Sequence, residues 1–249
     1  MQLPDFLNLG VGFSRYFSAV PAVTDELTRV AYRIRHDVYC AELGYEPVRP
    51  DGLETDAYDA HAAHCLVHAK ADQDYVGCIR LVFARSGEPD HPLPVERLCA
   101  QTIDRRIVDP ARLPRETIAE VSRLAVVTRY RRRKGEASRP GGIEPQDFGT
   151  AERPRFPYLT AGLYLAMMAQ ARRHGIKTLF FVTEPRLVKQ LTRLGVRLQR
   201  IGGAIEHRGT RVPSLLRVDD VIDGFGPLVR SFYEVVAAEI EAAYRARGL

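Results

Sequence analysis

The sequence predicts a single domain of the mixed α/β or α+β class, with a mixed central sheet flanked by helices. The chain has 249 residues, and its 45% hydrophobic and 27% charged residues are typical of a globular protein with a substantial core. Helical and strand-like patterns follow one another in an irregular order without an internal repeat. No apolar run approaches the ~20 residues that a membrane-spanning helix requires. We therefore expect one three-layered domain over residues 1–249.

The first expected helix covers residues 24–45. Thr24 is a suitable N-cap, and apolar residues recur after it at roughly helical spacing. Gly44 is typical of the end of a helix. A loop that contains prolines, a glycine and several acidic residues follows.

Two strands, over residues 63–71 and 75–84, are expected next. Two apolar runs flank a short polar stretch there, which predicts an antiparallel hairpin. A turn-rich loop covers residues 87–94, and residues 117–128 predict a further strand with alternating faces.

The second half of the chain begins with a segment rich in proline, glycine and charge, residues 131–157, which we expect to be a long, exposed basic insertion. Helices and strands alternate after it. The expected elements are an amphipathic helix over 158–175, a strand over 176–184, a helix over 185–195, two strands within 196–218 and a helix over 227–248.

The net charge of +5 is concentrated near this insertion, where one twelve-residue stretch from Thr128 holds six basic residues and one acid. Such a patch fits phosphate, an acidic protein or nucleic acid, and a solvated loop is the alternative. The segment lacks helix-turn-helix spacing and the aromatic pattern of RNA-binding sheets, so we expect no nucleic acid. A peripheral membrane contact is also compatible with it.

The four cysteines are widely separated and form no CxxC pair, which favours reduced thiols, most of them in the core. They are Cys40, Cys65, Cys78 and Cys99. The first residues have no basic region and no small-residue cleavage site, so they do not resemble a secretory signal. We expect a cytoplasmic protein.

Three histidines, His61, His64 and His68, follow the acidic loop, and together with its carboxylates they suggest a metal site. In a strand, however, His64 and His68 share one face while His61 stays in the loop. No second HxxxH occurs, and we expect no metal. The sequence also lacks the GxSxG, Walker and GxGxxG signatures of common hydrolases, NTPases and dinucleotide-binding proteins.

The acidic loop itself carries Glu54, Asp56 and Asp59. Alone, such a cluster is typical of a solvated turn. Arginines, tyrosines and a further glutamate, however, occur near the ends of the neighbouring elements and suggest an ion-pair network, which can be structural or can mark a site. They are Arg35, Tyr39, Tyr45, Arg80, Glu120 and Arg123.

Glu120 and Arg123 lie in one expected strand. Because side chains alternate along a strand, these two point to opposite faces unless a β-bulge separates them.

The series resembles the motifs of the acyl-homoserine-lactone synthases over about the first half of the chain. Those enzymes have an Arg, a Phe, a Trp, an ExDxxD motif, a further Arg and an ExSR motif at nearly the same spacings, and this chain has Tyr39 and Tyr45 at the two aromatic positions. The resemblance implies a GNAT-like acyltransferase fold. The stretches VERLC and EVSRLAV and the long basic loop look closer to the long-chain N-acyl amino acid synthases, and above all to the acyltransferases associated with the PEP-CTERM/exosortase system.

The resemblance implies transfer of a fatty acyl chain from acyl carrier protein, or from acyl-CoA, to the amine of a small amino-acid-like acceptor, without a metal. The amine must lose a proton when it attacks the thioester, so we expect Glu54, or Glu120 through a water molecule, to be the base, with Arg123 beside them. Backbone N–H groups around Val126 would stabilise the charge that develops on the thioester oxygen.

Two further groups of residues are implied. The acceptor would be held by Arg35, Tyr39, Tyr45, Asp56, Asp59 and Arg80. The basic residues Arg131, Arg132 and Arg133 would face the phosphopantetheine phosphate and the acidic carrier protein.

Three alternatives remain open at this point. An acyl-homoserine-lactone-type autoinducer synthase fits the motifs but not the two exchanged aromatic positions. A CoA-dependent acetyltransferase fits the fold, although RRRKGE replaces a glycine-rich pyrophosphate loop. A non-enzymatic nucleic-acid-binding domain fits the basic loop, but the acidic set would repel nucleic acid.

Overall fold

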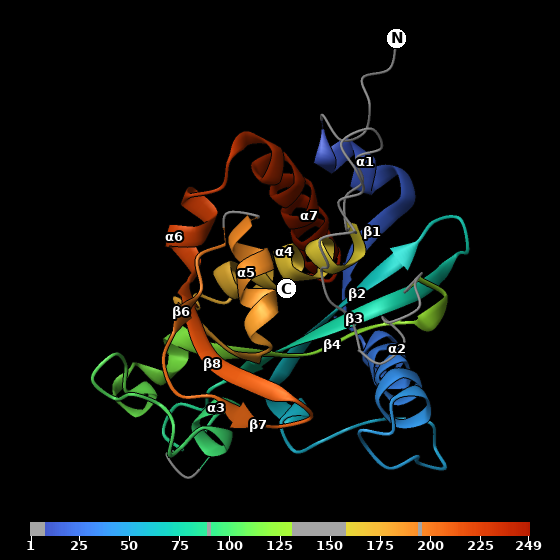
Figure 1. The fold of residues 1–249 in the computed structure, drawn as a ribbon. Helices are drawn as coiled ribbons and strands as arrows, with labels where there is room; N and C mark the ends of the chain where they lie inside the picture. The colour runs from blue at the N-terminus through green and yellow to red at the C-terminus, as the bar shows by residue number, and fades with distance from the viewer. Residues whose placement is uncertain (1–7, 89–90, 131–157, 194–195) are drawn as a thin grey trace.

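A computed structural model of the chain describes residues 8–88, 91–130, 158–193 and 196–249. An eight-stranded sheet in the order β1-β2-β3-β4-β5-β8-β6 forms its centre, with β7 paired to β8 (Figure 1). The strands are β1 (Phe17–Pro21), β2 (Ala62–Ala69), β3 (Asp74–Phe83), β4 (Ile118–Val126), β5 (Thr178–Thr183), β6 (Gln199–Arg200), β7 (Ile205–Glu206) and β8 (Thr210–Arg217). Strands β4 and β5 are parallel and the other pairs are antiparallel, so the sheet is mixed, as predicted.

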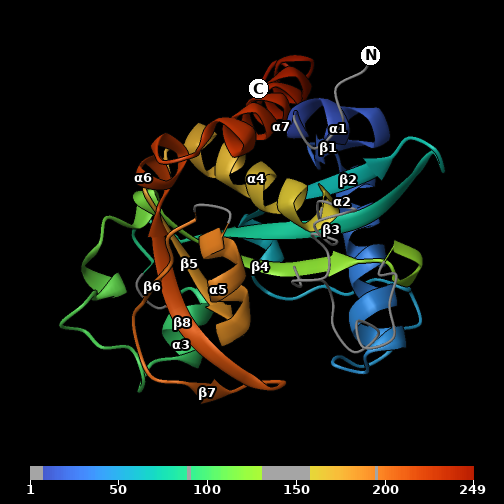
Figure 2. The same ribbon diagram turned by 45° about the horizontal axis from the view of Figure 1, so that its top comes forward.

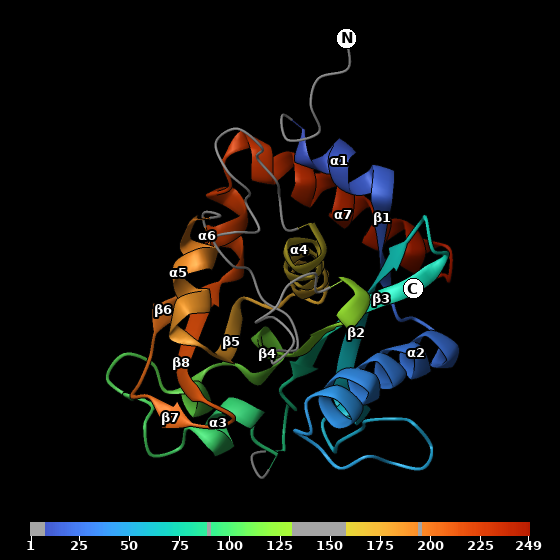
Figure 3. The same cartoon turned by 45° about the vertical axis from the view of Figure 1, so that its right-hand side comes forward.

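Helices cover both faces of this sheet. They are α1 (Leu9–Tyr16), α2 (Asp25–Arg35), which continues as a π-helix over His36–Glu42, α3 (Pro94–Leu98), α4 (Tyr158–Arg173), α5 (Pro185–Arg193), α6 (Val218–Asp223) and α7 (Pro227–Arg245). Helices α1, α4 and α7 lie together on one face and α2 lies on the other (Figures 2 and 3). The predicted arrangement of a mixed sheet between helical layers is confirmed.

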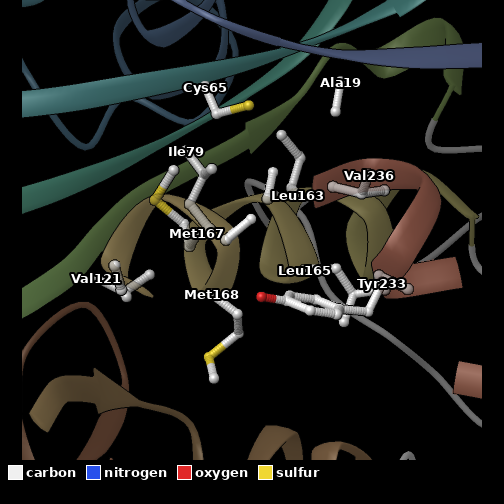
Figure 4. Close-up of a cluster of buried hydrophobic side chains, with 14 of the residues drawn as sticks. Ala19, Cys65, Ile79, Val121, Leu163, Leu165, Met167, Met168, Tyr233 and Val236 are labelled. Atoms are coloured by element: carbon white, nitrogen blue, oxygen red, sulfur yellow. The ribbon is translucent and has the colours of Figure 1, made fainter. Parts of the chain in front are cut away.

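Helix α4 is the centre of the larger apolar core. Its Leu163 and Met167 point toward Cys65 and Ile79 of the sheet, whereas Leu165 lies beside Tyr233 of α7 (Figure 4). The sequence predicts an amphipathic helix here, with one apolar stripe. The apolar surface of α4 is wider than that, because α7 covers the side of α4 that faces away from the sheet.

Most expected elements are confirmed, but residues 9–21 form a helix and a strand that the sequence analysis does not assign. Strand β1 pairs with β2 from Phe17↔Ala69 to Pro21↔Cys65 and forms an edge of the sheet. The short helices α3 and α6 are also unassigned. Short elements carry too few residues for a clear period, which explains these omissions.

The expected insertion over 131–157 lies outside the described residues, so its form stays a prediction, as does the single-domain organisation of residues 1–249. Among the described helices, none is both long and apolar enough to cross a membrane.

Strand β4 contains the β-bulge on which the position of Arg123 depends. Cys78 pairs with Ala125 while Arg80 pairs with Ser122, so β4 has one residue more than β3 in this interval. Arg123 takes up the extra residue with a left-handed backbone conformation, at φ 52°. Glu120 and Arg123 therefore lie on the same face of the sheet, the face covered by α2 and α3.

Strand β4 also extends beyond its pairing with β5. The paired residues run from Ile118↔Thr178 to Val121↔Phe181, and the last five residues of β4 follow this stretch. Val127 N–H donates to Val76 C=O in β3 at 3.0 Å. Because successive N–H groups of a strand alternate, Val126 N–H is directed to the other edge of β4.

Candidate active site

Helix α2 and the loop after it bring the acidic residues against the face of the sheet opposite α4. Glu54 N–H donates to the Tyr32 carbonyl at 3.1 Å, and Arg49 N–H donates to Nε2 of His36 at 3.1 Å. These bonds fix the loop against the last turns of the helix. The ExDxxD stretch therefore faces the sheet, although its sequence alone is also typical of a solvated turn.

Arg35, at the end of α2, is fully buried and holds two of the carboxylates. Its Nε donates to Glu54 Oε2. Its two terminal nitrogens donate to the two oxygens of Asp59 at 2.7 and 3.0 Å, which is a bidentate pair.

Arg80, on β3, extends this arrangement. Its Nη1 donates to Asp56 Oδ1 at 2.7 Å and to Asp59 Oδ1 at 2.8 Å, and its Nε donates to Ser122 Oγ at 3.1 Å. Arg80 therefore ties the acidic loop to the strand that carries the bulge.

Arg123 closes the group from the bulge. Its Nε and Nη2 each lie 3.2 Å from Glu54 Oε1, and its Nη2 lies 3.1 Å from Asp56 Oδ2. We call these six side chains the carboxylate–arginine network; they are Arg35, Glu54, Asp56, Asp59, Arg80 and Arg123.

The protonation of the network follows from its pairing. Burial disfavours the charged form of the three carboxylates, but the guanidinium groups together outweigh this effect. The pKa values of Glu54, Asp56 and Asp59 therefore lie below their ordinary values, and all three are ionised at neutral pH.

Glu120 has a different environment on the same face. Its side chain is 3% exposed, and one of its oxygens accepts the Val95 N–H at 2.6 Å. No guanidinium forms an ion pair with Glu120 in the described part of the chain. Burial raises the pKa of Glu120 to about 8, so this carboxyl group is mostly protonated at neutral pH.

The two tyrosines lie beside the bulge. The Tyr39 hydroxyl donates to the Leu124 carbonyl at 2.7 Å, and the Arg123 guanidinium lies 5.7 Å from the centre of the Tyr39 ring. The Tyr45 ring centre is 6.3 Å from that of Tyr39. The Val126 side chain is buried in the core against α4. Only the backbone of this residue can therefore face the carboxylate–arginine network.

The sequence analysis does not identify two residues of this region, Glu46 and Arg208. Arg208 lies in the turn between β7 and β8, and its Nη2 donates to Glu46 Oε1 at 2.6 Å. Its guanidinium also lies 5.4 Å from the centre of the Tyr45 ring. No sequence pattern signals this contact, because it joins residues 162 positions apart.

The three histidines do not converge. His64 is buried 3.5 Å from Asp59, His61 contacts Arg85, and the His68 ring packs on another tyrosine. Within the described ranges, no group of three or more His, Cys, Asp or Glu residues has the geometry of a metal site. Arg131, Arg132 and Arg133 lie outside the described residues.

Comparisons with known proteins agree with the predicted fold. Residues 34–138 match the acetyltransferase (GNAT) domain family. The acyl-homoserine-lactone synthase of Aeromonas salmonicida is 26% identical over 193 residues, 75% of this chain and 80% of that protein. The synthase of Vibrio anguillarum is 24% identical over 197 residues, 78% of this chain and 85% of that protein.

Solved structures show the same fold at low sequence identity. TofI, in a ternary complex with an inhibitor and MTA, superposes with a TM-score of 0.57 at 17% identity and covers 85% of this chain and 99% of its own. MesI, a CoA-dependent acyl-homoserine lactone synthase, gives 0.53 at 23% identity over 94% of this chain and 95% of its own. FeeM, an N-acyl amino acid synthase from uncultured soil microbes, gives 0.51 at 17% identity over 84% and 95%. The GNAT-like fold is confirmed.

Proposed function

We propose that this protein is an N-acyltransferase that moves a fatty acyl group from acyl carrier protein, or from acyl-CoA, to the amine of an amino-acid-like acceptor. The bulge at Arg123 is the observation that supports this function best. It brings the side chains of Glu120 and Arg123 to the face that holds the rest of the carboxylate–arginine network, where β4 extends past its parallel partner β5. The two relatives named above are acyl-homoserine-lactone synthases, and MesI and FeeM, an acyl-homoserine lactone synthase and an N-acyl amino acid synthase, share the fold.

The two candidate bases differ in their surroundings, and this difference favours Glu120. Glu54 contacts Arg35 and Arg123, and its lowered pKa makes it a weak proton acceptor. Glu120 has a raised pKa, and among the described residues only a backbone N–H bonds to it, so its ionised form has a stronger affinity for a proton. Glu120 is therefore the proposed base, and Glu54 positions Arg35 and Arg123.

The ammonium group of the acceptor first loses one proton to solvent. The neutral amine attacks the thioester carbonyl carbon, a C–N bond forms, and the nitrogen loses a proton to ionised Glu120, directly or through water. The Val126 N–H, directed to the edge of β4 that has passed β5, stabilises the negative charge on the thioester oxygen. The C–S bond breaks, and the departing sulfur takes the proton back from Glu120, which leaves a free thiol and an amide.

The network and the tyrosines form the proposed acceptor site. Asp56 and Asp59 attract the ammonium form of the acceptor before it loses its proton, while Arg35 and Arg80 keep these carboxylates in position. Tyr39 and Tyr45 supply the adjoining aromatic wall. Docking of the acidic carrier protein is assigned to Arg131, Arg132 and Arg133.

The test is mass spectrometry of lipid extracts from cells that express the wild-type chain or Glu120→Gln. We expect an N-acylated product with the wild type alone, and its mass gives the acyl length and the acceptor. Absence of any such product, together with a gel shift of a nucleic-acid probe by the purified protein, would instead support the non-enzymatic alternative.

A second candidate function is an acyl-homoserine-lactone-type autoinducer synthase. The two curated relatives at 26% and 24% identity favour it. The tyrosines at positions 39 and 45 favour a different acceptor. The same extracts distinguish the two functions, because a lactone has a neutral ring whereas an N-acyl amino acid keeps a carboxylate.

The narrower resemblance to the PEP-CTERM/exosortase-associated acyltransferases also belongs to this proposal, on the stretches VERLC and EVSRLAV. We propose a cytoplasmic location, where thioester donors are made and where thiols stay reduced. All four cysteines are free and buried, which fits this location.

A further inference from the structure

We infer that Arg208, together with Arg123, binds the carboxylate of the acceptor, so that the acceptor is an amino acid with a free carboxylate. This inference rests on the proposed function and specifies its substrate class. It assigns a specificity-determining role to a turn that lies far from the motif residues in the sequence.

The contact between Arg208 and Glu46 differs from the pairs inside the network. Arg35 and Arg80 are almost completely buried, whereas the side chains of Glu46 and Arg208 are 25% and 26% exposed. A small molecule that enters from solvent can therefore reach this pair, but it cannot reach the guanidinium of Arg35.

One carboxylate oxygen connects two guanidinium groups at this point. Glu46 Oε1 lies 2.6 Å from Arg208 Nη2 and 3.4 Å from Arg123 Nη2. A carboxylate in this place is thus held by two arginines from opposite halves of the chain. Glu46 occupies it as an internal carboxylate, and the acceptor's carboxylate would take its place.

Hydrogen bonds fix the backbone of the turn that carries Arg208, and the side chain itself is held by Glu46 and the Tyr45 ring. Arg208 itself has a left-handed backbone at φ 54°, and His207 N–H donates to the Gly209 carbonyl at 3.0 Å. Arg211 donates to the carbonyls of His207 and Arg208, at 3.2 and 3.1 Å, and pairs with Glu184 at the end of β5. A guanidinium that is pre-positioned in this way loses little freedom when it binds a ligand.

The location also fits the chemistry. Arg123 Nη2, which contacts Glu46, also contacts Asp56, the carboxylate proposed to attract the ammonium group. In an α-amino acid the carboxylate and the amine are attached to the same carbon. A carboxylate between Arg208 and Arg123 therefore keeps the amine close to the acidic residues and the bulge.

The charges around Arg123 favour replacement of the Glu46 carboxylate by that of the acceptor over binding of both carboxylates together. Arg123 already pairs with Glu54 and Asp56, so a further carboxylate beside Glu46 would meet like charge. The acceptor must displace Glu46, and Glu46 competes with it. Glu46→Gln should therefore strengthen acceptor binding, whereas Arg208→Met should weaken it.

The experiment compares each free amino acid with its own carboxamide as acceptor, with a long-chain acyl-CoA or a carrier protein loaded with the same acyl chain as donor. The readout is product by mass spectrometry, from which KM and kcat are obtained. We expect the wild type to prefer the free acid. Arg208→Met should raise the KM for the acid by about tenfold or more and leave the amide unchanged, because a charged hydrogen bond is lost. Glu46→Gln should lower the KM for the acid severalfold.

The matched control is Arg105→Met, which removes an exposed arginine that pairs with Asp109 away from this region. It should change neither acceptor. Arg208→Gln and a melting curve separate loss of binding from loss of the fold, and Glu46→Gln tests the same site without altering the turn.

The outcomes separate failure of the carboxylate-binding role of Arg208 from failure of the proposed acyltransferase function. If Arg208→Met lowers acid and amide turnover equally, or if the wild type uses both equally, acceptor transfer stands and the inference is wrong. If the wild type acylates neither compound, the proposed N-acyltransferase function is itself wrong, and the inference is wrong with it.

Discussion

The molecule contains two kinds of buried or half-buried carboxylate on one face of its sheet. Glu54, Asp56 and Asp59 each contact at least one guanidinium group and have lowered pKa values. Glu120 lies on the same face, contacts a backbone N–H, and has a raised pKa of about 8. Burial acts in the same direction on all four groups, so the partner decides the outcome.

This difference separates two tasks. Carboxylates that stay charged at all working pH values can order arginines and attract an ammonium group, but they are poor bases. A carboxyl group whose pKa is near the working pH can accept and return a proton.

The largest expected effect follows from removal of Arg35. Arg35→Met leaves Glu54 and Asp59 buried without their main partner, and should lower the free energy of unfolding by about 3–5 kcal/mol. Chemical denaturation measures this change. The exposed control Arg105→Met should stay within about 0.5 kcal/mol of wild type. A change below about 1 kcal/mol for Arg35→Met would mean that the network is not a stabilising unit.

Glu120→Gln should affect the reaction and spare the fold. The amide is similar in shape to the protonated acid, so the fold should be kept. At neutral pH the variant should be more stable than wild type, because its side chain does not ionise when the chain unfolds. The turnover number should fall by roughly 10²- to 10⁴-fold, because the base is lost. Steady-state kinetics of thiol release measures the effect. Wild-type turnover in this variant would remove Glu120 from the mechanism and leave Glu54 as the candidate base.

The pH dependence of stability should have opposite signs in the two regions. The folded pKa of Glu120 is raised above its ordinary value of 4.5 to about 8, so the folded state binds more protons than the unfolded state between these values. Stability should therefore fall as pH rises across this window, by at most about 1.4 kcal/mol per pH unit. The contribution of Glu54, Asp56 and Asp59 is present above their ordinary pKa values and is lost as pH falls through the lowered ones.

Denaturation at several pH values compares wild type with Glu120→Gln. The variant should lose the decline between about pH 4.5 and 8 and keep the loss in acid. Turnover by the wild type should rise with pH through about 8, as the ionised form of Glu120 accumulates. Parallel stability curves for the two proteins would show that Glu120 is ionised at neutral pH.

Tyr39→Phe should have the smallest effect. It removes the hydroxyl that donates to the Leu124 carbonyl but keeps the ring beside Arg123. The expected cost is about 1 kcal/mol of unfolding free energy, with a small rise in acceptor KM. A much larger loss of turnover at unchanged stability would give the hydroxyl itself a chemical role.

Local patterns in the sequence predict most of this fold. The helix over 24–45, the hairpin and the alternation after residue 158 have clear periods, and the structure has matching elements. The bulge is different, because the sequence shows only that Glu120 and Arg123 could not share a face in a regular strand. The bulge can be identified only from the pairing of β4 with β3.

For the same reason, the sequence predicts the motif residues of the candidate site but not their protonation or the role of Arg208. The motif residues are read from spacing and resemblance, and six of them converge in the structure. The different protonation of Glu54 and Glu120 depends on which side chains surround each one, and Arg208 reaches Glu46 across 162 positions. Such information lies in the packing of distant segments and leaves no periodic trace in the chain.

The bond between Glu239 and Ala19 has a consequence for how the chain is made. Glu239 of α7 accepts the Ala19 N–H of β1 at 2.7 Å, across 220 positions. The edge strand β1 emerges from the ribosome well before the helix that holds it, because 220 positions separate the two residues. Until then the first strand and the aromatic face of α1 lack their cover, so a nascent or interrupted chain presents an open sheet edge to chaperones and to other chains.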